Sequence, residues 1–351
     1  MKIFEPARLA SMELRNAVAV APMSRMQAQD DGSISSDMPA YYARYARDGA
    51  GLVMTEAIYV DERSGRAYFN QPGLAKDEQG EGWRRVVDAV HAAGGRIFAQ
   101  LQHGGRLAEP GLNPLHLAAS DGVAAGNTWQ TGRPNAPARA ATVDEIQEIV
   151  TSFGAAARRA RQAGFDGVEI HGARGYLIDD FLSASTNQRT DAFGGSLGAR
   201  LEMPLAVVRS VRSAIGTLPL SFNFSLYKMD NVAYQPPGGR NEVREIIRAL
   251  RGADVDILHV STRKALRSES WGEPLFRTVV EAASGDVIAN GGFTTLEDCE
   301  AALQEGGATA VSIARAYLAN PDWLTRTLAR TDLARYAPGQ ERLPLLGAVG
   351  G

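Results

Sequence analysis

Eight short apolar stretches, each followed by a longer segment of helical periodicity, constrain the fold of this 351-residue chain more than any other feature. The stretches are rich in branched residues, as buried parallel strands are. Eight strand-then-helix units are the number that closes a (β/α)8 barrel, and such barrels commonly run to about 250 residues or more as one domain. The expected strands cover residues 17–22, 52–57, 97–101, 167–171, 220–225, 257–261, 287–290 and 310–313.

A doubly wound open sheet is the structural alternative to a barrel. Such a sheet usually has fewer strands per domain, and no linker-like stretch divides this chain in two. We therefore expect a single α/β domain, a TIM barrel that spans residues 1–351. Within it, the spacing of Thr142 and Glu145 predicts a capping box at the start of a helix, and Gly164 stands where the C-cap of that helix belongs.

One connection is unusually long. Residues 102–141 follow the third expected strand and show neither helical nor strand periodicity. A loop of this length in a compact domain is usually functional, as a lid or binding loop, or else disordered. Because the segment begins at the C-terminal end of a strand, where the active sites of these barrels lie, we interpret it as a lid-like insertion.

The amino-acid composition limits which binding partners and which cellular compartment we expect. The net charge is −3 and the basic residues are scattered, which indicates neither nucleic acid nor an anionic membrane as a partner. No apolar run approaches the roughly 18 residues of a membrane-spanning helix, and the first residues lack the apolar core of a signal peptide. The single cysteine, Cys299, fits a reducing compartment. We expect a cytoplasmic protein that acts on a small molecule. The apolar tail, residues 343–351, is a candidate partner surface and makes a homo-oligomer an expectation.

Polar side chains stand at the C-terminal ends of five expected strands. Polar groups within apolar strands carry a desolvation penalty unless something hydrogen-bonds them. One such residue is usually satisfied by its neighbours, but five on the same rim indicate a functional site. The five are Ser24 after the first strand, Gln100 and His171 at the ends of the third and fourth, Asn223 in the fifth, and "NGG" (290–292) after the seventh.

Two segments indicate a phosphate site. "IANGGF" follows the seventh strand and "IARAYLANP" the eighth, and phosphate is commonly held by these two loops of a TIM barrel. Glycines let the backbone approach a ligand closely, and Arg315 can add a charge-assisted hydrogen bond. No cluster of His, Cys or carboxylate residues has metal-ligand spacing, so no metal site is expected.

The ordered motifs resemble those of the old yellow enzymes, a family of FMN-dependent oxidoreductases. "VAVAPMSRM", "GAGLVMTEA" and "FAQLQHGGR" are similar to the family's first three strand motifs. "AGFDGVEIHGARGYLIDDFLSASTNQRTDAFGGS" is similar to its long signature around the fourth strand, and "IANGGF" and "SIARAYLANPDW" to its flavin-phosphate segments. The resemblance implies a TIM barrel that binds FMN and is reduced by NADH or NADPH.

The resemblance also implies roles for individual residues. His171 and residue 174 would grip a carbonyl oxygen of the substrate, and Tyr176 would protonate the carbon α to it. Two donors aimed at the oxygen stabilise the charge that develops as a hydride arrives at the β carbon, and the tyrosine acts as general acid from the opposite face. The implied flavin-ring residues are Pro22, Met23, Ser24, Ala57 and Gln100, and the implied phosphate residues are Gly291, Gly292, Ala314 and Arg315.

The residue at position 174 departs from the family pattern. The family has His or Asn where this chain has Arg174, which is longer, permanently charged and suited to bidentate contact with carboxylate or phosphate. Arg174 either faces a pocket for an anionic or strongly polarised substrate, or turns away into a surface ion pair with Asp179 or Asp180. A smaller departure is Ala314, where the family commonly has glycine, and we interpret it as tolerated.

Asn223 is a further departure. It replaces an arginine that the family usually places beside N1 and the C2 carbonyl of the flavin. Loss of that charge should disfavour the anionic reduced flavin and lower its potential, unless Lys228 or Arg263 replaces it.

Three functions are compatible with these patterns. The first is an ene-reductase, which uses NADH or NADPH to reduce an activated C=C bond. The second is an FMN enzyme of the same barrel that dehydrogenates, aromatises or isomerises a biosynthetic intermediate, which Asn223 and Arg174 favour. The third is a flavin-binding protein with little turnover, against which the retention of Tyr176 and His171 argues.

Overall fold

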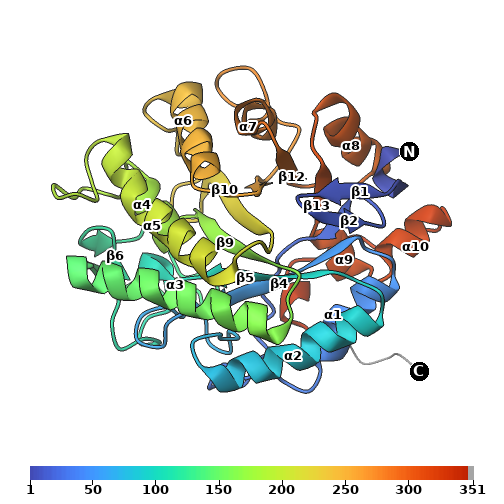
Figure 1. Cartoon of the computed structure of the whole chain (residues 1–351), viewed down its shortest axis with the longest axis horizontal. Coiled ribbons are helices and arrows are strands. Elements are labelled where there is room, and N and C mark those ends of the chain that lie inside the picture. The colour runs from blue at the N-terminus through green and yellow to red at the C-terminus, as the bar shows by residue number, and fades with distance from the viewer. Residues whose placement is uncertain (347–351) are drawn as a thin grey trace.

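In the computed structural model, which describes residues 1–346, eight parallel strands close into a barrel (Figure 1). The strands follow one another around the barrel in chain order, and the last pairs with the first. All eight strands expected from the sequence are present, so the open sheet is excluded. They are β3 (Val18–Val20), β4 (Leu52–Tyr59), β5 (Ile97–Gln102), β9 (Gly167–Arg174), β10 (Leu220–Lys228), β11 (Ile257–Ser261), β12 (Asp286–Asn290) and β13 (Ala310–Ile313).

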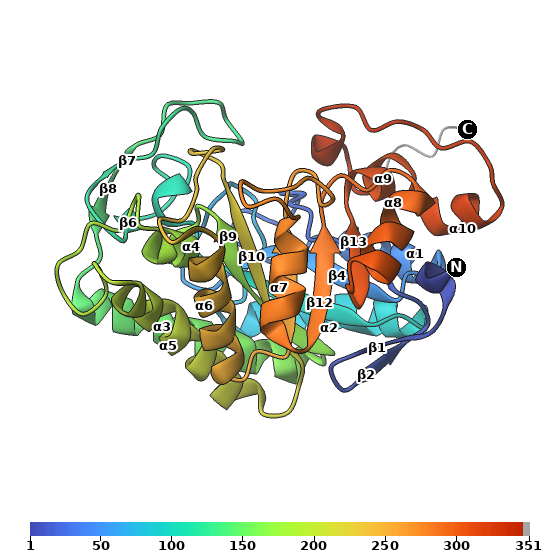
Figure 2. The same ribbon diagram turned by 90° about the horizontal axis from the view of Figure 1, so that it is seen from above.

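Helices surround the barrel (Figures 1 and 2). The capping box expected at Thr142 is present: its Oγ1 accepts a hydrogen bond from the Glu145 amide at 3.2 Å, and the helix ends at Gly164 with φ 91°. The α-helices are α1 (Met38–Arg47), α2 (Asp77–Ala92), α3 (Val143–Ala163), α4 (Leu177–Leu182), α5 (Leu197–Ile215), α6 (Gly239–Gly252), α7 (Leu275–Ala283), α8 (Leu296–Glu300), α9 (Arg315–Ala319) and α10 (Trp323–Leu328). Within residues 1–346 no helix has both the length and the apolar character that a bilayer span requires.

An N-terminal hairpin closes one end of the barrel. Strands β1 (Ala7–Leu9) and β2 (Met12–Leu14) pair antiparallel, and their leucines pack into a small apolar cluster with side chains from inside the barrel, among them Leu52 and Phe98. The larger core lies between the strands and the helices. The hairpin lies at the opposite end of the barrel from the 102–141 segment (Figure 2), which leaves the C-terminal ends of the strands for a ligand.

The 102–141 segment, whose sequence shows neither helical nor strand periodicity, contains short elements of regular structure. A short helix, η2 (Gly105–Leu107), is followed by a three-stranded sheet of β6 (Leu117–Ala118), β8 (Pro137–Ala140) and β7 (Gly122–Val123). Strands of two to four residues are too short to show an alternating pattern in the sequence. That the segment acts as a lid stays a prediction.

The chain beyond α10 returns to the barrel beside the C-terminal ends of the strands. The Arg25 guanidinium donates to the carbonyl oxygens of Glu341 at 2.9 Å and Leu343 at 2.6 Å. Arg342 in turn donates to the carbonyl oxygen of Trp129 at 3.0 Å, which ties this segment to the 102–141 insertion. The end of the apolar tail, residues 347–351, lies outside the described residues.

Candidate active site

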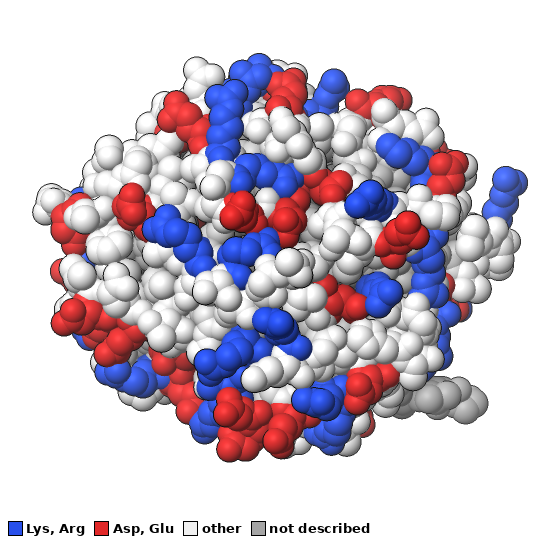
Figure 3. Space-filling model, viewed as in Figure 1, with Lys and Arg blue, Asp and Glu red and all other residues white. Residues whose placement is uncertain are grey.

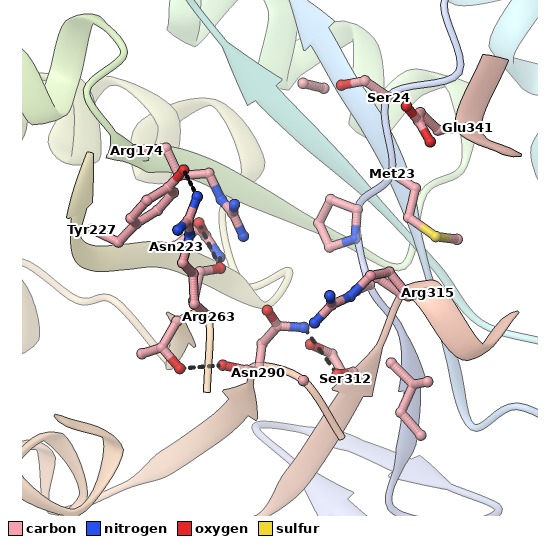
Figure 4. Close-up of a pocket in the computed structure, with 18 of the residues that line it drawn as sticks. Met23, Ser24, Arg174, Asn223, Tyr227, Arg263, Asn290, Ser312, Arg315 and Glu341 are labelled. Carbon is pink, nitrogen blue, oxygen red and sulfur yellow. Dashed lines mark hydrogen bonds between the residues drawn. The ribbon is translucent and has the colours of Figure 1, made fainter. Parts of the chain in front are cut away.

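A cavity of about 720 Å³ opens at the C-terminal ends of the strands (Figure 4). Every strand of the barrel, or the loop that follows it, contributes to its wall, so residues far apart in sequence meet there. Of the site residues expected from the sequence, all but Gly291 line this cavity: Pro22, Met23, Ser24, Ala57, Gln100, His171, Arg174, Tyr176, Asn223, Gly292, Ala314 and Arg315.

His171 and Tyr176 lie side by side in this wall, with their ring centroids 5.2 Å apart. Both side chains are buried. Burial lowers the pKa of His171 to about 3, and the neighbouring charge of Arg174 acts in the same direction. The imidazole is therefore neutral at physiological pH, and its Nδ1 atom has no hydrogen-bond partner among residues 1–346. A neutral imidazole carries one N–H donor that can serve a ligand.

Arg174 ends strand β9 with its side chain directed into the cavity (Figure 4). Its backbone is left-handed, with φ 65°, a conformation that a non-glycine residue keeps only where its surroundings hold it. Strand β10 and the residue that follows it do so: the Arg174 amide donates to Ser225 Oγ at 3.0 Å, and its carbonyl accepts from the Met229 amide at 3.0 Å. The guanidinium carbon lies 5.8 Å from the centroid of the Tyr227 ring.

A surface ion pair between Arg174 and Asp179 or Asp180 is excluded, because both carboxylates are buried and bonded elsewhere. Asp179 accepts from the Lys228 ammonium at 2.5 Å and from the Gly175 amide at 2.6 Å. Asp180 accepts from the Ala119 amide at 2.7 Å. Both carboxylates belong to helix α4, and neither lines the cavity.

Lys228 does not replace the missing family arginine, because its ammonium is committed to Asp179 and it does not line the cavity. Arg263 does line the cavity, and its Nη2 donates to the Tyr227 hydroxyl at 3.1 Å. Asn223 itself is buried and donates to Ser261 Oγ at 2.8 Å. Of the two candidate replacements, Arg263 alone remains.

The loops after β12 and β13 leave room for a ligand that approaches the backbone. Gly291 has φ 148°, and a Cβ there would lie 2.3 Å from Thr262 Oγ1. Gly292 has φ 65°, and its Cβ would lie 2.8 Å from the Arg263 carbonyl oxygen and 3.5 Å from Arg315 Nη2. Neither position accepts a side chain without strain, and an arginine stands beside the second. This glycine–arginine arrangement fits a phosphate group.

A buried network beneath the cavity was not anticipated. The Glu169 carboxylate, fully buried in β9, accepts from Gln100 Nε2 at 2.8 Å and from the Ser221 hydroxyl at 2.7 Å, and lies 2.8 Å from His259 Nδ1. His259 Nε2 lies 2.7 Å from Ser312 Oγ, so both ring nitrogens of this histidine are satisfied within the core. The acidic residue inside the apolar stretch "GVEIH" was the available signal. Because the Gln100 amide nitrogen is bonded to Glu169, its amide oxygen remains for a ligand.

Other wall residues come from segments without recognisable motifs. The side chains of Tyr68, Trp129 and Met229 cover the side of the cavity near Tyr176, and the Tyr176 hydroxyl lies 3.5 Å from Met229 Sδ. Tyr227 of β10 lines the wall beside Arg174, and the C-terminal segment adds Tyr336 and Glu341. His103, at the root of the insertion, is bonded to Ser64 at 2.9 Å and does not line the cavity.

Fold and site together define a class: a (β/α)8-barrel protein that holds a phosphate-bearing cofactor at the mouth of the barrel, next to a neutral histidine and a tyrosine. Within residues 1–346 no group of three or more His, Cys, Asp or Glu side chains is arranged to hold a metal ion.

The model of the NADH:flavin oxidoreductase / NADH oxidase family matches residues 2–332, and the chain belongs to this family. The old yellow enzyme homologue from Zymomonas mobilis has a similar structure, with a TM-score of 0.89 and 30% identity, covering 97% of this chain and 96% of that one. The fold, the cofactor FMN and the nicotinamide reductant implied by the motifs are therefore confirmed at the level of the family.

Two curated relatives differ in the share of their own length that this chain covers. It is 33% identical over 335 residues to an NADH oxidase of Thermoanaerobacter brockii, covering 92% of this chain and 50% of the relative, so it spans about half the length of that protein. It is 34% identical over 330 residues to putative 12-oxophytodienoate reductase-like protein 1 of Arabidopsis thaliana, covering 90% of this chain and 96% of the relative.

Proposed function

We propose that this protein is an FMN-dependent ene-reductase that uses NADH or NADPH to reduce the C=C bond of an α,β-unsaturated carbonyl compound. The observation that carries the proposal is the pairing of a neutral His171 with Tyr176, at a ring separation of 5.2 Å, in the wall of the cavity. The same end of the barrel holds the glycine–arginine loops around Gly291, Gly292 and Arg315, which we call the phosphate cradle. Membership of the NADH:flavin oxidoreductase family supports the cofactor and the reductant.

The residues that would bind the cofactor lie in the glycine–arginine loops and in the neighbouring wall of the cavity. Bound FMN would supply the chemistry of hydride transfer between the reduced nicotinamide and the alkene. The glycine–arginine loops would hold its phosphate, and Gln100 would offer its amide oxygen to the ring. The residues we assign to FMN are Pro22, Met23, Ser24, Ala57, Gln100, Asn223, Gly291, Gly292, Ala314 and Arg315.

Three side chains would act on the substrate. His171 donates a hydrogen bond to the carbonyl oxygen, on which negative charge develops, and the positive charge of Arg174 stabilises the same change. Tyr176 delivers its phenolic proton to the α carbon. Its hydroxyl contacts the weakly accepting sulfur of Met229, which leaves that proton available.

Dehydrogenation or aromatisation of the substrate is the second candidate. As a departure from the family pattern Asn223 favours it, but the expected effect of Asn223 on the flavin argues against it. Unless Arg263 supplies the missing charge, a neutral side chain in place of the family arginine lowers the flavin potential, and a flavin of lower potential is a weaker oxidant. The same change favours transfer of electrons to an alkene. The buried His171–Tyr176 pair likewise gives a low-turnover binding role no support.

The test is anaerobic turnover of cyclohexenone by the FMN-loaded protein with NADH and with NADPH. Tyr176→Phe should lower the rate of ketone formation by about 10²–10⁴-fold, the usual worth of a general acid, while reduction of the flavin by the nicotinamide persists. Tyr234→Phe is the matched control, because Tyr234 does not line the cavity. A flavin that NAD(P)H reduces but that passes no electrons to any activated alkene would overturn the proposal.

A further inference from the structure

The cavity carries more positive charge than a cofactor phosphate needs. Among residues 1–346, four cationic side chains line it against a single carboxylate, that of Glu341. A phosphate monoester brings about −1.5 to −2 charges, so positive charge remains after it binds. On the face of the molecule that Figure 3 shows, by contrast, positively and negatively charged side chains are interspersed. The four cations are Arg174, Arg263, Lys264 and Arg315.

Glu341 does not neutralise the cation at the substrate end. Its carboxylate accepts from the Tyr336 hydroxyl at 2.6 Å and from the Gly339 amide at 3.1 Å. It lies next to Ser24, across the cavity from Arg174 (Figure 4). Within the described part of the chain, no carboxylate forms an ion pair with the Arg174 guanidinium.

Arg174 belongs to a cationic wall built around Tyr227. The guanidinium carbon of Arg263 lies 4.6 Å from the centroid of that ring and that of Arg174 lies 5.8 Å from it. The Tyr227 hydroxyl accepts a hydrogen bond from Arg263 and thereby holds the second guanidinium at the rim. Two guanidinium groups gathered at one ring repel each other, and an anionic group between them would relieve that repulsion.

The geometry points to a substrate of defined class: an α,β-unsaturated carbonyl compound that carries a separate carboxylate. Arg174 binds the carboxylate through its two-pronged donor set, Arg263 adds charge from the rim, and His171 remains the donor to the carbonyl oxygen. The inference rests on the proposed function and deepens it. The carboxylate takes no part in the electron balance, in which the alkene gains one hydride and one proton and one reduced nicotinamide is oxidised.

A binding experiment tests the carboxylate site without turnover. The oxidised FMN-loaded protein is titrated with 4-oxopentanoate and with its methyl ester, two saturated compounds that cannot be reduced at a C=C bond, and the flavin absorbance is followed. The acid should bind at least tenfold more tightly than the ester. In Arg174→Asn that preference should disappear, because the affinity for the acid falls at least tenfold more than the affinity for the ester.

The choice of Asn protects the test against misfolding, because Asn tolerates the left-handed backbone of residue 174 better than most residues. Arg267→Gln is the matched control, since Arg267 is exposed on the same loop as Arg263 but does not line the cavity. Arg263→Gln should weaken the acid several-fold. This assay contains no nicotinamide, so a change in affinity does not arise from binding of nicotinamide phosphates. An unchanged affinity for the acid in Arg263→Gln would show that Arg263 does not help to bind the carboxylate.

A turnover experiment separates this inference from the proposed function. The substrates are (E)-4-oxopent-2-enoate, its methyl ester and cyclohexenone. A kcat/KM at least tenfold higher for the acid than for the ester, lost in Arg174→Asn, supports the inference. Equal reduction of all three, unchanged in the variant, overturns the inference and leaves the ene-reductase standing. If none is reduced, the proposed function fails, and the titration still decides whether the anion site exists.

Discussion

The ammonium of Lys228 lies 2.5 Å from Asp179 Oδ1, and both side chains are buried. This one pair answers two questions that the sequence left open. Asp179 is unavailable to Arg174, whose guanidinium lies in the cavity instead. Lys228 is unavailable to a flavin, so it does not compensate for Asn223.

The same pair gives the first prediction. Lys228→Met leaves the Asp179 carboxylate buried without its cation, and burial already raises the pKa of that carboxyl. Breaking a buried ion pair by removing one partner costs about 3–5 kcal/mol. Urea unfolding should show a loss of that size, and the double variant Lys228→Met/Asp179→Asn should recover part of it. A single variant as stable as the parent would show that the pair contributes little.

The second prediction concerns the flavin potential. Asn223→Arg restores a cation where the family usually has one and should raise the midpoint potential of bound FMN. A favourable change of about 1.4 kcal/mol corresponds to about 30 mV for a two-electron couple. Spectroelectrochemical titration measures it, with Asn223→Gln as the neutral control. If Arg263 has taken over the role, Arg263→Gln alone should lower the potential and Asn223→Arg should change it little.

Much of the fold was predictable because its signals are local. Eight apolar stretches of strand length, a capping box at Thr142 and a glycine at 164 each act through neighbouring residues, and all are present in the structure. The strands of the 102–141 insertion escaped prediction because two to four residues carry no period. Their pairing depends on residues as many as 22 positions apart, such as Leu117 and Arg139.

The sequence predicts which residues line the site, but not where each side chain points. Motif positions identify which residues gather at the barrel mouth, since the C-terminal ends of parallel strands meet there. Whether Arg174 points in or out depends on contacts made by Ser225 of β10 and by Met229, which follows that strand. The partners of Glu169 come from β5, β10 and β11, and no spacing within one segment reveals such a set.

The third prediction concerns the phosphate cradle. Arg315→Gln removes a charge-assisted hydrogen bond worth about 1.5–3 kcal/mol, so the Kd for FMN should rise about tenfold or more. Gly291→Ala should weaken binding too, because the added methyl group meets Thr262. Quenching of FMN fluorescence measures both, and Arg248→Gln, an exposed arginine away from the cavity, is the control. The released flavin should be FMN rather than FAD. Unchanged affinity for FMN in both variants would show that these loops do not bind the phosphate.

A fourth prediction addresses the network around Glu169. Glu169→Gln offers one acceptor oxygen to groups that now share a carboxylate, namely Gln100, Ser221 and His259. At least one buried polar group then loses its partner, at a penalty of about 1–3 kcal/mol. Thermal unfolding should show that loss, and the Kd for FMN should rise because Gln100 is no longer held. The exposed Glu202→Gln should do neither. Full stability with full FMN affinity would mean that the network has no positioning role.

The last prediction is a pH dependence of stability that originates at His171. Burial lowers its pKa from the ordinary 6.5 to about 3, so between these values the unfolded chain binds a proton that the folded protein does not. The stabilising contribution is therefore complete above about pH 6.5 and is lost as the pH falls towards 3. At about 1.36 kcal/mol per pH unit, lowering the pH from 6.5 to 5 removes about 2 kcal/mol. His103, whose burial lowers its pKa to about 4, acts with the same sign, so the comparison must isolate one histidine. His171→Asn does this: urea unfolding at pH 7.5 and pH 5 should show a smaller loss for the variant than for the parent. Equal losses would mean that the pKa of His171 is the same in the folded and the unfolded protein, so that burial does not hold the imidazole neutral.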